Sequence, residues 1–66
     1  MPKYKIIATS NLDDESVSDV LVCDSIDNLI YGNAIVEMLN LKFASDTSRY
    51  YFIIKLQEYM LYRFQP

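Results

Sequence analysis

The first stretch of the chain alternates side chains in a way that predicts a β-strand. The segment KYKIIATS, residues 3–10, repeats with a period of two. The segment NLDDES then has the composition of a turn, and VSDVLVCD, residues 17–24, is rich in valines that favour strand. The two strands are expected to form a hairpin with an acidic tip. The faces of the first strand are Tyr4, Ile6 and Ala8 on one side and Lys3, Lys5, Ile7 and Thr9 on the other.

The period changes after residue 24, and the apolar spacing predicts a helix from about Ile26 to Phe43. Asp24 or Ser25 is expected to cap the N-terminus of this helix. Asp27 then falls in the first turn, where a carboxylate interacts favourably with the helix dipole. At about 100° per residue, one side of the helix forms an apolar stripe that can pack on a sheet. This stripe consists of Leu29, Gly32, Ile35, Val36, Leu39 and Phe43.

The same helix carries a second apolar stripe, rotated away from the first, that consists of Tyr31, Ala34, Met38 and Leu41. One sheet covers one stripe, and apolar patches larger than a few hundred Å² usually mark a contact site. Three candidates could cover this second stripe: the C-terminal segment of the same chain, a second copy of the chain, or a different protein. Gly32, in the middle of the helix, costs up to about 1 kcal/mol relative to alanine. A close approach by another backbone would explain that cost.

The C-terminal segment RYYFIIKLQEYMLYRFQP leaves two interpretations open for residues 49–64. Apolar side chains at even positions, from Tyr50 to Phe64, predict one long strand or a hairpin that turns near Gln57 and Glu58. The helix formers in KLQEYML favour a second helix instead.

We therefore expect all 66 residues to form a single small domain of the α+β class. Its architecture is a small antiparallel sheet, β-β-α-β or β-β-α-β-β, with one helix packed on one face. The alternative is an N-terminal hairpin followed by two helices. A domain this small needs unusually good packing or a second copy to cover its apolar surface.

The charge of the chain is concentrated, because residues 11–27 hold six of the nine acidic residues and no Lys or Arg. One interpretation is that these carboxylates only solvate a hairpin tip. The other is a band of negative charge that faces a positively charged partner and imitates the spacing of phosphates. The candidate partner-binding residues are Asp13, Asp14, Glu15, Asp19, Asp24 and Asp27.

The residue inventory disfavours catalysis and cofactor binding. The chain has no histidine, which is the commonest general base, and its single glycine rules out a glycine-rich phosphate loop. The run DDESVSD lacks the glycine of an EF-hand, so we expect no metal site and no cofactor. Cys23 is expected to be a buried small apolar residue rather than a reactive thiol. No signal peptide or membrane span is recognisable, so we expect an intracellular protein.

A net charge of −3 argues against sequence-independent nucleic-acid binding. One arrangement would still permit it, in which basic strand residues gather at a sheet edge among the tyrosines and bases stack on the rings. The residues concerned are Lys3, Lys5, Arg49 and Lys55.

The sequence thus predicts a non-catalytic binding protein that occludes a site on another protein and forms a homodimer. By fold-level analogy with small phage-encoded inhibitors, the expected target is a host nucleic-acid-processing or defence enzyme. The alternatives are a structural or assembly subunit whose function is self-association, and a small nucleic-acid binder. The residues expected in self-association or apolar contact are Tyr31, Ala34, Met38, Leu41, Tyr59 and Tyr62.

Overall fold

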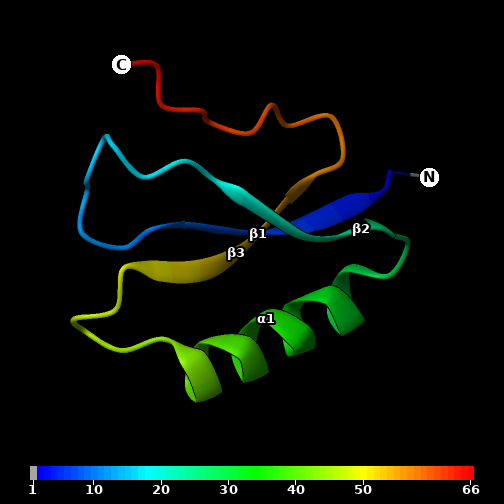
Figure 1. Cartoon of the computed structure of the whole chain (residues 1–66). Coiled ribbons are helices and arrows are strands. Elements are labelled where there is room, and N and C mark those ends of the chain that lie inside the picture. Colours follow the sequence, from blue (N-terminus) through cyan, green and yellow to red (C-terminus); the bar gives the residue numbers. More distant parts are fainter. Residues whose placement is uncertain (1) are drawn as a thin grey trace.

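The computed structural model describes residues 2–66 and has the element order strand, strand, helix, strand. The elements are β1 (Tyr4–Ser10), β2 (Val20–Ile26), α1 (Leu29–Phe43) and β3 (Tyr50–Leu56). The strands form one antiparallel sheet in the order β2-β1-β3, and α1 packs on one face of it (Figure 1). The predicted α+β class is confirmed in its β-β-α-β form, and the alternative with two helices is wrong.

The core lies on both faces of the central strand, because α1 covers one face and the C-terminal residues cover the other. Ile6 and Ile7, which point to opposite faces, are both fully buried. On the side of α1, Ile6 pairs with Ile54 of β3, and on the other side Ile7 pairs with Ile53. The period of two predicted for residues 3–10 is therefore confirmed.

The helix starts later than the sequence predicts. Asn28 is its N-cap, and the Asn28 side chain accepts hydrogen bonds from the backbone N–H groups of Ile30 and Tyr31. Ile26 belongs to β2, where it pairs with Tyr4 of β1. A helix that began near Ile26 would break this pairing, so the predicted caps are wrong and Asp27 precedes the first turn. The residues proposed as caps, Asp24 and Ser25, both lie in β2.

The second strand is also displaced, since it begins at Val20 rather than Val17. Its pairing with β1 contains two register irregularities, and Ser25 has a positive φ of 58°. Bulges of this kind bend an edge strand and interrupt its ladder. Residues 11–19 form the connection between β1 and β2, where the sequence predicts a shorter turn.

Gly32 marks the closest approach of α1 to the sheet. A Cβ atom at this position would lie 2.6 Å from Ile54 Cδ1 and 3.3 Å from Ile26 Cγ2. The neighbours are side chains of the chain's own strands rather than another backbone. Val36 and Leu39 are half-buried beside it, whereas the marginal members of the predicted stripe, Leu29, Ile35 and Phe43, stay exposed.

The C-terminal segment is part strand and part irregular chain. After β3 a turn occurs at residues 57–58, as predicted, but residues 59–66 form neither helix nor strand. They run along the sheet face opposite α1 (Figure 1). The expectation that this segment covers the second stripe of the helix is therefore wrong, because the tail is bonded to the other side of the sheet.

Candidate interaction surfaces

Large apolar side chains cover the side of α1 that points away from the sheet. We call the set Ile30, Tyr31, Ala34, Met38 and Leu41 the outer face of α1. Ile30 is 78% exposed, Tyr31 69%, Met38 72% and Leu41 86%, and Ala34 is exposed as well. Four of these five residues form the second stripe that the sequence predicts, and the described part of the chain does not cover it.

The apolar surface continues from α1 to the adjacent edge strand. The helix packs over β1 and β3 and makes no comparable contact with β2. Val20 pairs with Ala8 and Cys23 pairs with Ile6, so both side chains of β2 point to the face that carries α1. Val20 is 48% exposed. Cys23 is half-buried, whereas the sequence predicts that it is buried.

The opposite face of the sheet is organised by one buried carboxylate. Asp19, only 5% exposed, accepts hydrogen bonds from Thr9 Oγ1 at 2.6 Å, Tyr59 OH at 3.1 Å and Tyr62 N at 2.8 Å. The backbone N–H of Asp19 donates to the carbonyl oxygen of Tyr62 at 2.8 Å. Buried charges are tolerated when several donors satisfy them, so this network fixes the tail on the sheet.

Two tyrosines therefore have roles that the sequence does not reveal. Tyr59 and Tyr62 were expected in a self-contact, yet both hold the tail, and Tyr62 OH also donates to the carbonyl oxygen of Glu15 at 2.6 Å. Burial, and then the hydrogen bond to Asp19 and its negative charge, raises the pKa of Tyr59 above its ordinary value of 10.0.

A groove of about 530 Å³ runs between the tail, residues 13–15 and β3. Its volume lies in the range of ligand pockets, about 300–1,000 Å³. Lys55 lies in this groove, with its Nζ 4.8 Å from the centre of the Tyr59 ring. The groove is thus aromatic in its walls and acidic at one end. Its aromatic walls are Tyr51, Tyr59 and Tyr62, and its acidic rim is Asp13, Asp14 and Glu15.

The acidic rim is an ordered loop. Ser16 donates its backbone N–H and its hydroxyl to Asp14 Oδ1, at 2.9 and 2.6 Å. These bonds, the hydroxyl's foremost, hold the pKa of Asp14 below its ordinary value. Asp13 and Glu15 on either side are exposed and face solvent.

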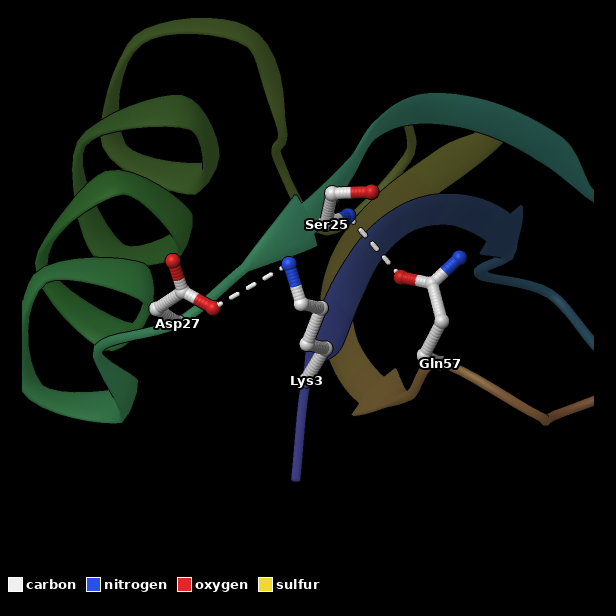
Figure 2. Close-up of polar contacts among 4 residues, drawn as sticks. All are labelled: Lys3, Ser25, Asp27 and Gln57. Atoms are coloured by element: carbon white, nitrogen blue, oxygen red, sulfur yellow. Dashed lines mark hydrogen bonds and ion pairs between the residues drawn. The ribbon is translucent and has the colours of Figure 1, made fainter. Parts of the chain in front are cut away.

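The six candidate carboxylates do not form one band. Asp19 is buried, so a partner cannot contact it, and its prediction as a partner-binding surface residue is corrected. Asp24 and Asp27 lie at the opposite end of β2 from the acidic rim. There, Asp27 pairs with Lys3 Nζ at 3.4 Å, and Gln57 accepts from the backbone N–H of Ser25 (Figure 2). The structure therefore keeps together only the three carboxylates of the rim.

No pattern in the sequence signals the burial of Asp19. Residues 17–19 precede β2, so a period of two does not apply to them, and Leu21, two residues further on, is exposed.

Within residues 2–66, no three His, Cys, Asp or Glu side chains lie close enough to hold a metal ion. The described part of the chain also contains no helix with both the length and the apolar character needed to cross a membrane. Comparisons with protein-family models, with curated proteins and with solved structures found no match to this chain.

Proposed function

We propose that this chain is a non-catalytic binding protein that acts by covering a site on another protein. The observation that carries the proposal is the acidic rim, Asp13, Asp14 and Glu15, which borders a groove walled by Tyr51, Tyr59 and Tyr62. Concave sites that combine aromatic walls with a few charged groups are common binding sites. The absence of histidine from the sequence also removes the commonest general base.

The proposed target presents positive charge, because the chain offers it an acidic rim beside an aromatic groove. Exposed carboxylates of Asp13 and Glu15 would steer the encounter with a basic segment. Tyrosine rings of the groove would then contact the aliphatic and guanidinium parts of arginine side chains. A basic nucleic-acid-binding site on an enzyme has this chemistry, and covering it would inhibit the enzyme.

Binding of an arginine-rich peptide at low ionic strength tests the role of the rim. Asp13→Asn with Glu15→Gln removes two charges from the rim but leaves Asp14, which orders the loop through Ser16. We expect the Kd of the peptide to rise at least about tenfold, since each close charge pair contributes about 1 kcal/mol or more to such encounters.

The matched control removes the same number of charges from the other end of β2, by Asp24→Asn with Asp27→Asn. It is expected to change the Kd by less than about threefold, because the local rim is intact. Equal weakening by both pairs would show that the peptide senses only net charge and would contradict a local site.

A second candidate function, an assembly subunit that only self-associates, is favoured by the outer face of α1, where four large apolar side chains are 69–86% exposed. Ionic strength separates the two, since salt screens the steered encounter with a basic partner but leaves an apolar contact unchanged or stronger.

Nucleic-acid binding is less well supported. Lys5 is buried in the central strand and Lys3 pairs with Asp27, so they do not form the exposed basic edge that this function requires.

A further inference from the structure

We propose that the outer face of α1 binds the same face of a second copy of this chain, with the two helices antiparallel. This inference goes beyond the proposed function, which uses the acidic rim and the groove rather than α1. Four observations carry it: the symmetry of the apolar spacing, the sizes of the side chains, the ends of the helix, and the amount of exposed surface.

The apolar spacing on the outer face reads the same in both directions. Tyr31, Ala34, Met38 and Leu41 are separated by three, four and three residues, which is the a/d spacing of a coiled-coil seam. When a second copy of α1 is turned end for end, Tyr31 lies opposite the partner's Leu41, and Ala34 lies opposite the partner's Met38. The stripe is therefore complementary to itself under a two-fold rotation, as a symmetric dimer requires.

The sizes of the side chains favour antiparallel over parallel helices. In the antiparallel pair, each Ala34 faces a Met38, so a small and a large side chain share each central layer. In a parallel pair, two copies of Ala34 would face each other next to two copies of Met38. That arrangement leaves a gap in one layer and crowding in the next.

The ends of the helix agree with this orientation. An antiparallel pair places the C-terminal turn, which carries Lys42, beside the N-terminus of the partner's helix, which follows Asp27. The two helix dipoles are then antiparallel, which is the favourable arrangement. Exposed ion pairs contribute little to binding in either orientation, whether between Lys42 and the partner's Asp27 or, in a parallel pair, between Glu37 and the partner's Lys42.

The exposed area of the chain is larger than a monomer of its mass should have. A folded monomer of 7.7 kDa is expected to expose about 4,300 Å². This chain exposes 4959 Å². The excess of about 650 Å² is surface that the packing of a single copy leaves exposed.

Disulfide trapping tests the orientation, with Cys23→Ser in every variant so that only the introduced thiols react. We expect a mixture of the Tyr31→Cys and Leu41→Cys chains to form a disulfide-linked dimer rapidly under oxidising conditions, as followed by non-reducing gel electrophoresis. Each variant alone is expected to react at least about tenfold more slowly, because identical positions lie at opposite ends of an antiparallel pair. Both positions are exposed, so neither change is expected to disturb the fold.

Glu37→Gln gives an independent readout by sedimentation equilibrium. In the antiparallel pair, Glu37 lies near the partner's Glu37, so the variant is expected to dimerise at least about twofold more tightly at neutral pH. In a parallel pair, the same change would remove attraction to the partner's Lys42 and weaken the dimer.

Rapid self-linking of Leu41→Cys together with weaker dimerisation of Glu37→Gln would overturn the antiparallel arrangement while leaving the proposed function intact. A chain that stays monomeric and links in no combination would overturn the dimer altogether. The peptide-binding comparison of the acidic rim would still decide the proposed function in that case.

Discussion

At the scale of single residues, Asp19 determines the course of the C-terminal chain. Its carboxylate accepts bonds from Thr9, Tyr59 and Tyr62, which are far from it in sequence. The sequence places Asp19 in a run of acids, and acids are usually exposed. Its burial depends on donors that only the folded chain brings together, so composition alone could not predict it.

Replacement of Asp19 by alanine is expected to destabilise the fold by at least about 2 kcal/mol. The change leaves three donors without their acceptor, and bonds to a charged group contribute about 1.5–3 kcal/mol each. Urea unfolding measures the effect. Asp24→Ala, at an exposed position of β2, is expected to stay within about 0.5 kcal/mol of the parent. Similar small losses for both variants would contradict the role of Asp19.

The raised pKa of Tyr59 predicts a loss of stability at alkaline pH. Above the ordinary value of 10.0, the unfolded chain releases this proton while the folded chain retains it, so the free energy of unfolding falls as pH rises. The stabilisation is fully present below pH 10 and disappears as pH passes through the folded pKa. The stability difference between the parent and Tyr59→Phe is therefore expected to shrink as pH rises through this range. Denaturant unfolding at neutral and alkaline pH measures the difference, and a difference that stays constant over this range would contradict the role of Tyr59.

At the scale of elements, the sequence predicts the kinds of element better than their ends. Period two identifies β1, and the longer apolar period identifies α1. The start of α1 depends on the pairing of Ile26 with Tyr4, a long-range contact that cannot be predicted from local capping preferences. Residues 59–66 carry both strand and helix patterns, and they adopt neither because Asp19 and Ser18 bind their backbone N–H groups.

The edge of β3 illustrates an interaction between elements that no pattern predicts. Asn40 of α1 donates Nδ2–H to the carbonyl oxygen of Phe52 at 2.8 Å and accepts from the Phe52 N–H at 2.7 Å. A side-chain amide thus occupies the place where another strand would pair, which protects an otherwise open edge.

Asn40→Ala is expected to destabilise the chain by about 1–3 kcal/mol, because two part-buried hydrogen bonds are lost at about 0.5–1.5 kcal/mol each. The variant should also aggregate more readily, since the edge of β3 becomes free to pair. Thermal unfolding and turbidity measure the two effects. Asn33→Ala, at an exposed position of the same helix, is the control, and an equal loss there would exclude the edge contact as the cause.

At the scale of the whole molecule, a three-stranded sheet and one helix leave many large apolar side chains exposed. The sequence already contains this imbalance, because α1 has two apolar stripes and one sheet can cover only one. It could not show where the tail goes, since that depends on contacts with Asp19. The account's central claim is that a second copy covers the outer face of α1.

Light scattering coupled to size exclusion, over a concentration series, tests this claim most directly. Leu41→Glu and Met60→Glu form a matched pair, because Leu41 is 86% and Met60 85% exposed while only Leu41 lies on α1. We predict that the parent chain and Met60→Glu have twice the 7.7 kDa chain mass and that Leu41→Glu has the mass of one chain. A monomeric parent chain, or equal dissociation of both variants, would contradict the account.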